Sequence, residues 1–226
     1  MGNKGIVEHS PRQTSWRDTE HYWTVQIIGS DGNARSGVMC EAMTPAMNIM
    51  QLAKLRGQQK PKGNPHPANM YEVLQFATRA YNLREEFPEQ AESLRTTLQN
   101  GMRRYANTTT VVAYNPEGQQ DEVIHDYQTS DSKIIQGDFV GCDGDIEKVQ
   151  PLSLLEATLG TRDIDEINNI AQWLNNTPAY LWRVNSKPQK RDERVARFVA
   201  GSYGLDFGCD WNPQGQYPAF RVLVEE

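Results

Sequence analysis

Cysteine and long apolar segments are scarce in this sequence, and both shortages restrict what the chain can be. The three cysteines, Cys40, Cys142 and Cys209, lie far apart and form no CxxC pair, which argues against a disulfide framework and a zinc knuckle. No apolar run approaches the roughly 20 residues of a membrane span. The N-terminus lacks the apolar core of a signal peptide. We therefore expect a cytoplasmic or virion-associated protein without membrane insertion.

An excess of positive charge is also missing. The net charge is −6, whereas a general nucleic-acid binder needs a basic surface to capture phosphates. Basic residues do cluster at Arg103-Arg104 and between Lys187 and Arg197, but acidic residues interrupt the second cluster. This alternation is typical of a solvated face, so we expect no nucleic-acid partner.

The local signatures of catalysis and metal binding are absent too. The chain has no GxxxxGK[ST], GxGxxG or GxSxG motif. His125-Asp126 is a candidate base with its orienting carboxylate, but neighbouring residues of a strand point to opposite faces. Asp143-Gly144-Asp145 resembles the start of a calcium loop, yet Lys148 stands near the place of the final glutamate. We predict no catalytic residue, no metal ligand and no cofactor.

The residues that are present predict an α+β fold. Residues 1–20 are polar and aperiodic, which favours an N-terminal arm, and 21–226 are expected to form a single α+β domain. The β-branched and aromatic run Tyr22–Ile28 predicts a strand, and Thr44-Pro45 predicts the N-cap of a following helix. Apolar residues at three- and four-residue spacing predict a helical hairpin over 67–105.

The second half of the chain reads mainly as strands. A change of composition near residue 150 marks a new unit, in which a helix beginning near Thr161 precedes a series of short strands. Those strands are predicted at 180–184, 194–200, 205–209 and 220–224. Between 198 and 213 an apolar or small set alternates with a chemically mixed set that contains tyrosine, phenylalanine and tryptophan. Such exposed aromatic rings among glycine and aspartate are typical of recognition surfaces.

The segment 179–226, with its closing Ala219-Phe220-Arg221-Val222, resembles the end of a C-type-lectin-like fold. More specifically, it resembles the variable proteins of diversity-generating retroelements of archaea and their viruses. The resemblance implies a lectin-like variable portion over 150–226, with the helical hairpin as an insertion or N-terminal module. It also implies that the last strand pairs with an early one, for which Tyr22–Ile28 is the candidate. Alanine replaces the usual glycine of Gly-Phe-Arg, and the usual Gly-Gly-Ser-Trp is replaced near Arg194–Arg197.

The resemblance and the residue pattern together predict a variable surface that binds a protein ligand on a cell or virus. Its expected residues are Val199, Gly201, Tyr203, Gly204, Asp206, Phe207, Gly208, Asp210, Trp211, Gln216 and Tyr217. Two alternatives remain open. An enzyme of the formylglycine-generating type would need a reactive cysteine pair, and Cys209 has no near partner in sequence. A viral structural protein would use the helical hairpin for oligomer contacts.

Overall fold

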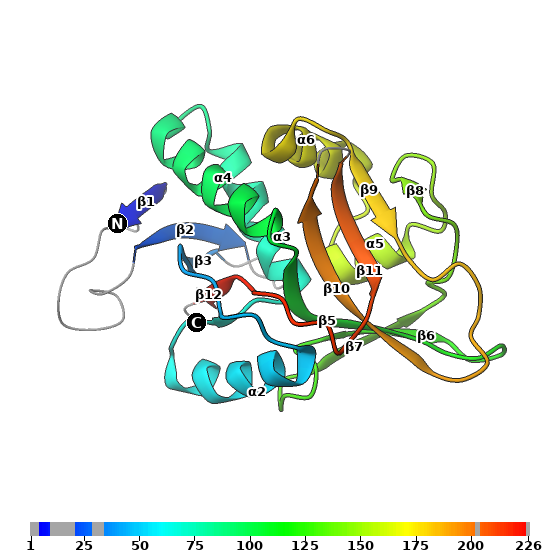
Figure 1. Cartoon of the computed structure of the whole chain (residues 1–226). Coiled ribbons are helices and arrows are strands. Elements are labelled where there is room, and N and C mark those ends of the chain that lie inside the picture. The colour runs from blue at the N-terminus through cyan, green and yellow to red at the C-terminus, as the bar shows by residue number, and fades with distance from the viewer. Residues whose placement is uncertain (1–4, 10–20, 29–33, 202–203, 225–226) are drawn as a thin grey trace.

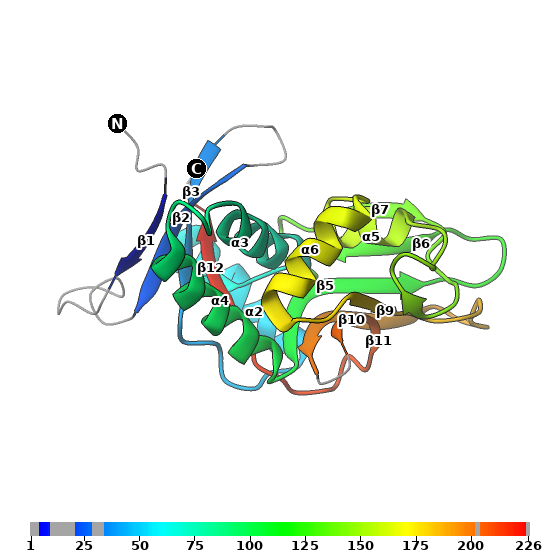
Figure 2. The same ribbon diagram turned by 90° about the horizontal axis from the view of Figure 1, so that it is seen from above.

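The computed structural model describes residues 5–9, 21–28, 34–201 and 204–224. These residues form two β-sheets and five α-helices, which confirms the α+β class (Figure 1). The smaller sheet lies at one end of the molecule and the larger sheet at the other (Figure 2). A large core of buried apolar side chains extends from Ile6 to Val222 and joins both sheets, and a smaller cluster lies beside it around Ile49 of helix α2 (Ile49–Gln59).

The smaller sheet brings the beginning and the end of the chain together. Its strand order is β1-β2-β3-β12-β4. The strands are β1 (Ile6–His9), β2 (Tyr22–Ile28), β3 (Ala34–Cys40), β12 (Arg221–Val224) and the short β4 (His66–Pro67). The last strand therefore pairs with β3 and β4, and β3 separates it from β2. The expected direct pairing with Tyr22–Ile28 is wrong by one strand, because the β2–β3 hairpin places its second strand on the inside.

Part of the predicted N-terminal arm is ordered. Ile6–His9 pairs antiparallel with β2, so this stretch is an edge strand rather than an arm. Apart from Gly5, the remainder of that arm lies outside the described residues. Ile6 is 2% exposed and joins the common core, which explains why this strand docks.

The larger sheet has the order β7-β6-β5-β10-β11-β9-β8. Its strands are β5 (Ala106–Tyr114), β6 (Asp121–His125), β7 (Lys133–Gly137), β8 (Gly144–Asp145), β9 (Ala179–Trp182), β10 (Asp192–Ala200) and β11 (Leu205–Trp211). β9 and β11 run parallel and the other neighbours antiparallel. Two parallel strands cannot be joined by a tight hairpin turn. Here the chain passes through β10 between β9 and β11.

The helical hairpin is present as α3 (Met70–Asn82) and α4 (Pro88–Met102). Asn69 caps α3 in a reciprocal capping box with Glu72, and Pro88 occupies the first turn of α4, where its missing N–H costs nothing. The side chains of α3 and α4 contribute to the common core beside residues of both sheets. The hairpin is thus part of the domain. Gly101 in α4 lets the Phe220 ring approach closely, since an added Cβ would lie 2.3 Å from that ring.

The remaining helices cover the two faces of the larger sheet. They are α2 (Ile49–Gln59), continued by the short 3-10 helix Lys60–Lys62, α5 (Ser153–Leu159) and α6 (Ile164–Asn175). Val112 and Tyr114 of β5 face the common core, to which α5 and α6 belong, whereas Val111 and Ala113 pack with Ile49 of α2. Helices α5 and α6 therefore lie on one face of this sheet and α2 on the other.

Candidate binding surface

Helix α2 packs against β5, β6 and Val195 of β10 on its face of the larger sheet, and the same face continues over β9, β10 and β11. On these strands Leu181, Phe198 and Phe207 point into the common core. The alternate residues point the other way, because successive side chains of a strand face opposite sides. They are Tyr180, Trp182, Arg197, Val199, Asp206, Gly208 and Asp210. We call this solvent-facing side of β9–β11 the open face.

A β-bulge adds Trp211 to the open face. Val195 pairs with Trp211, whereas Arg197 pairs with Gly208, so β11 carries one more residue than β10 between these pairs. The extra residue reverses the alternation, and Trp211 points to the side of Val195 instead of into the common core. Bulges of this kind are common beside binding sites because they redirect a side chain.

Four side chains gather where the bulge ends, and we call them the Arg197 cluster: Tyr105, Arg197, Trp211 and Tyr217. The Arg197 guanidinium carbon lies 3.5 Å from the centre of the Trp211 ring, within the range of a cation–π contact. It lies 5.4 Å from the centre of the Tyr105 ring and 5.9 Å from that of Tyr217. The Tyr217 ring in turn contacts Trp211 edge-on at 5.5 Å. The rings therefore hold the cation in a fixed position.

Backbone features position this cluster. Gly208 lies opposite Arg197, and an added Cβ there would be 3.3 Å from the Arg197 side chain, so glycine leaves room for the arginine to cross the strand. Tyr105 has φ 61, a left-handed conformation that costs a non-glycine residue about 1–2 kcal/mol. Its ring is nevertheless 45% exposed, so burial does not offset this strain. Strained residues with exposed side chains occur at functional sites.

The polar atoms of the cluster are incompletely satisfied. Arg197 Nε, Arg197 Nη1 and Trp211 Nε1 are buried donors without a hydrogen-bond partner among the described residues. Asn107, which pairs with Arg197 across the sheet, adds a buried Oδ1 acceptor in the same condition. Buried polar groups are nearly always paired, and each unpaired one costs about 1–3 kcal/mol. The cluster and Asn107 thus leave four buried polar atoms unpaired, as Trp23 and Arg56 each do at one nitrogen.

The charges on the open face are partly desolvated. Burial lowers the pKa of Arg197, against the opposing effect of Asp210 and Asp206. Burial raises the pKa of both aspartates, again against the Arg197 charge. A hydrogen bond from the Trp182 indole also acts on Asp206. Neither carboxylate forms an ion pair with any residue of the described segments.

The structure distributes the predicted surface residues over three environments. Asp206, Asp210, Trp211 and Tyr217 are half-buried on or beside the open face, Gly201 and Gln216 are exposed, and Val199, Gly204 and Gly208 are buried. Phe207 is wrong as an exposed anchor: it is 1% exposed and stacks edge-on against Phe198 in the core. Side chains alternate strictly along this part of β11, so Phe207 points into the core together with Leu205 and Cys209. Tyr203 lies outside the described residues.

The prediction missed four side chains of the surface: Tyr105, Tyr180, Trp182 and Arg197. Trp182 and Tyr105 are the two exposed large aromatic side chains of the described residues, at 40% and 45%. Alternation along β9 was a usable signal for Tyr180 and Trp182. Tyr105 lies before β5, about a hundred residues from the other members, and no local pattern connects it with them.

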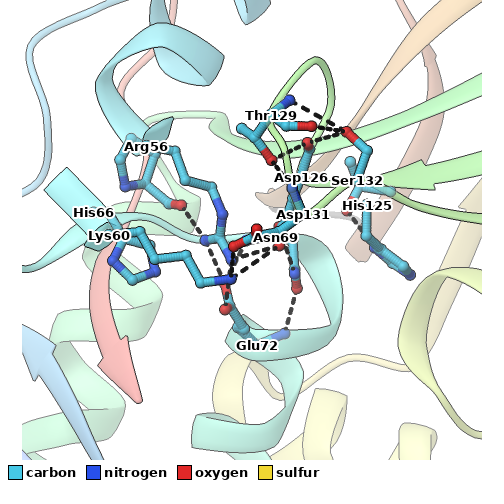
Figure 3. A network of polar contacts seen from close by, with 12 residues as sticks. Arg56, Lys60, His66, Asn69, Glu72, His125, Asp126, Thr129, Asp131 and Ser132 are labelled. Atoms are coloured by element: carbon cyan, nitrogen blue, oxygen red, sulfur yellow. Dashed lines mark hydrogen bonds and ion pairs between the residues drawn. The ribbon is translucent and has the colours of Figure 1, made fainter. Parts of the chain in front are cut away.

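A second polar assembly lies deep between α2, α3 and the turn after β6 (Figure 3). Arg56, 1% exposed, donates from Nη1 and Nη2 to the two Glu72 carboxylate oxygens, each at 2.9 Å. The same guanidinium donates to Asp126 at 2.8 Å and to the Pro67 carbonyl at 2.7 Å. Asn69 donates to the other Asp126 oxygen at 2.9 Å. We call these side chains the Arg56 network.

Mutual electrostatics keep this network charged. Burial acts to raise the pKa of Glu72, but the charge and hydrogen bonds of Arg56 prevail and lower it to about 2. Burial likewise acts to lower the pKa of Arg56, and the two carboxylates raise it above its ordinary value. Adjacent His66 stays neutral, because burial lowers its pKa to about 4. The network holds α2 against α3 and β6.

The His125-Asp126 pair does not form a catalytic dyad. His125 contacts Thr110 Oγ1 at 2.9 Å through Nδ1 and the Ala157 carbonyl at 2.8 Å through Nε2, while Asp126 binds Arg56. Both ring nitrogens are therefore occupied, and Asp126 lies in the turn after β6 with φ 54. Burial also lowers the pKa of His125.

In the described part of the chain, neither the cysteines nor potential metal ligands are grouped into a site. Cys40 and Cys209 are buried, Cys142 is exposed, and none of the three forms a disulfide. Burial raises the pKa of the Cys209 thiol, which disfavours the reactive thiolate. Among the described residues no three His, Cys, Asp or Glu side chains are placed to bind a metal ion. Asp145 of the suspected calcium loop instead pairs with Lys148 at 2.6 Å.

None of the helices in the described ranges is long and apolar enough to cross a membrane. Comparisons of the chain with family models, with curated proteins and with solved structures find no match.

Proposed function

We propose that this chain is a recognition protein that binds a protein ligand through the open face and the Arg197 cluster. The observation that carries this proposal is the combination of strained, exposed Tyr105 with a stacked arginine whose buried donors lack partners. Aromatic and arginine side chains supply most of the affinity in protein interfaces, where their polar atoms find partners in the ligand.

The arrangement of strands supports the more specific proposal of a C-type-lectin-like variable protein. The last strand returns to the sheet of the first strands, and the helices α2, α3 and α4 precede the β5–β10–β11 sheet. The surface lies on β10, β11 and the segment that leads to β12, where the resemblance places the diversified residues. The ligand is then a protein on a cell or virus, met by a cytoplasmic or virion-associated binder. Burial of Cys209 favours recognition over the formylglycine-generating alternative.

Site-specific crosslinking tests the binding surface. A photo-reactive phenylalanine replaces exposed Gln216 beside the cluster, and a control carries it at Ile134 on β7, 56% exposed and in the edge strand beyond β6. Proteins captured only through position 216 from a host surface extract are identified, purified and titrated against the unmodified chain. Trp211→Ala should weaken this binding about 30-fold or more, as expected for a central anchor. Unchanged affinity in Trp211→Ala contradicts the proposal.

Sequencing the gene in several isolates tests variability. The proposal expects a neighbouring reverse-transcriptase gene and a near-copy of the 3′ coding segment that differs at adenines. The structure adds which codons should vary: Asp206, Asp210 and Trp211 face solvent, whereas Phe198 and Phe207 fill the core. Substitutions spread equally over both sets, or no repeat near the gene, would exclude a variable protein and leave the binding proposal to the crosslinking result.

A further inference from the structure

A pocket that the proposed recognition surface does not use lies on the other side of the larger sheet. Its volume is about 380 Å³, and it is lined by α3 and by the turn that joins α5 to α6. These three helices pack together on the face opposite α2 (Figure 2). Small-molecule sites in proteins usually have volumes of roughly 300–1,000 Å³, so this pocket suits a compact ligand. Such a ligand would bind independently of the open face.

The first wall of the pocket is one side of α3. The lining residues recur at three- and four-residue spacing, which places them on a single helix face: Tyr71, Leu74, Gln75, Thr78, Arg79 and Asn82. The Tyr71 hydroxyl accepts a hydrogen bond from Gln75 Nε2 at 2.6 Å, and this bond orients the ring. The wall therefore combines an oriented aromatic ring with amide, hydroxyl and guanidinium groups.

The second wall is the turn between α5 and α6. Gly160 ends α5 with φ 79, a left-handed conformation that glycine adopts without strain. A Cβ at this position would lie 2.4 Å from the Tyr71 ring, so the ring packs directly on the backbone of the turn. Thr161 donates to Glu166 Oε2 at 3.3 Å. These contacts hold the two walls in a fixed relation to each other.

Two opposite charges line the pocket without pairing. Of the described lining residues only Arg79 and Glu166 are charged, and neither forms an ion pair with any part of the chain that the structure describes. Arg79 Nε is buried, whereas Nη1 and Nη2 are neither buried nor hydrogen-bonded to a described residue, and the same holds for Glu166 Oε1. Long helical side chains lean toward the helix N-terminus, which directs Arg79 along the wall toward Gln75.

This pair of charges selects among ligand classes. A simple anion would be attracted by Arg79 and repelled by Glu166, and a simple cation would meet the reverse, so in either case one of the two charges opposes binding. A ligand that carries both signs on neighbouring atoms compensates both charges. The Tyr71 ring, with Leu74 and Leu159 beside it, offers apolar contact to the rest of such a ligand.

We propose that this pocket binds a free α-amino acid with an apolar side chain. The carboxylate of the ligand accepts from the terminal nitrogens of Arg79, and its ammonium group donates to Glu166 Oε1. The side chain of the ligand packs against the Tyr71 ring.

Calorimetric titration of the full chain with each of the twenty protein amino acids at neutral pH tests this proposal. Each amino acid that binds is compared with its analogues that lack the amino group or the carboxylate, which for leucine are isocaproate and isoamylamine. Saturation-transfer NMR extends the measurement to weakly bound analogues. The site variants are Arg79→Gln, Arg79→Lys and Glu166→Gln. The matched controls are Arg84→Gln, which removes a nearby cation stacked on Tyr81, and Asp165→Asn, which removes an exposed carboxylate beside Glu166. Thermal melting verifies the folding of each variant.

At least one apolar amino acid should bind with a Kd below about 1 mM. Loss of either charged group from the ligand should weaken binding at least tenfold, as should Arg79→Gln and Glu166→Gln, because each change leaves one charge uncompensated. Arg79→Lys keeps the charge and should bind more tightly than Arg79→Gln, and both controls should bind like the unaltered chain. The analogue without a carboxylate should bind Arg79→Gln and the unaltered chain equally, because it has lost the group that Arg79 contacts.

Three outcomes refute the proposal. Failure of every amino acid to bind below about 1 mM excludes the ligand class. Binding that is unchanged in both Arg79→Gln and Glu166→Gln takes place elsewhere on the chain. A deamino analogue that binds as tightly as its parent amino acid shows an anion site rather than a site for a zwitterion. None of these results bears on the open face, whose test is the effect of Trp211→Ala on protein binding.

Discussion

Replacing Arg56 by methionine should destabilise the protein more than any surface charge substitution. Methionine keeps much of the apolar stem but removes the guanidinium that pairs with Glu72 and Asp126. The two carboxylates then keep only their bonds from Asn69 and the Lys60 contact of Asp126, and the Pro67 carbonyl loses its bond from Arg56. Breaking a buried ion pair on one side costs about 3–5 kcal/mol. A domain has only about 5–15 kcal/mol of total stability, so the loss is a large fraction of it.

Thermal and urea unfolding, followed by circular dichroism, measure this effect. For chains of 150–250 residues each kcal/mol lowers the melting temperature by roughly 2–4 °C, so Arg56→Met should melt about 6–20 °C lower. Arg162→Met is the matched control: Arg162 pairs with Glu156 at the surface, and its loss should leave the melting temperature unchanged. A double variant that also replaces Glu72 by leucine should recover part of the loss. An Arg56→Met protein as stable as the unaltered chain would falsify the view that this network holds α2 in place.

Three further predictions concern acid stability, helix packing and thiol access. The pKa of His66 is lowered from 6.5 to about 4 and that of Glu72 from 4.5 to about 2, so the folded state binds fewer protons than the unfolded state. Urea titrations should therefore show stability falling from about pH 6.5 to pH 2, and a flat profile in this window would contradict both shifts. Gly101→Ala should lower the melting temperature, because its Cβ would clash with a core phenylalanine ring that cannot move freely; an unchanged or higher melting temperature would show that the helix shifts at no cost. In the native state Ellman's reagent should label Cys142 alone, with the two buried cysteines reacting only on unfolding, and more than one fast thiol would refute this burial.

The class of the fold and most elements were accessible from the sequence because periodicity records burial. The apolar stripes over 67–105 correspond to α3 and α4, and the β-branched runs correspond to β5, β10 and β12. Their exact ends were less accessible. The predicted N-cap Thr44 is not a cap: α2 begins at Ile49 after Asn48, which forms a capping box with Gln51. Two candidate cap residues four positions apart cannot be separated without knowing which one the tertiary structure exposes.

The β-bulge between β10 and β11 explains the position of Trp211, whereas Phe207 follows the regular alternation of β11. If β11 had no bulge, regular alternation would place the Trp211 side chain in the core together with Phe207. The structure has Phe207 inside and Trp211 outside, which only an inserted residue allows. No composition signal marks that insertion in the sequence. The partners of Arg56 were equally hidden, since the sequence separates Arg56 from Asp126 by 70 residues.

The two polar assemblies of this chain differ in a way that bears on function. In the Arg56 network both terminal nitrogens of the guanidinium are bonded to carboxylates or a carbonyl, and the assembly lies deep in the domain. In the Arg197 cluster the guanidinium stacks on Trp211, and its Nε and Nη1 are buried without a partner, whereas in Arg56 only Nε is in this condition. A sequence that specifies one fold satisfies its polar groups wherever only stability is at stake, and departures concentrate where a ligand completes the pairing. Because stacking on Trp211 already fixes the Arg197 side chain, this side chain would lose little conformational entropy when a ligand binds. This contrast within one molecule favours the Arg197 cluster over the Arg56 network as the functional site.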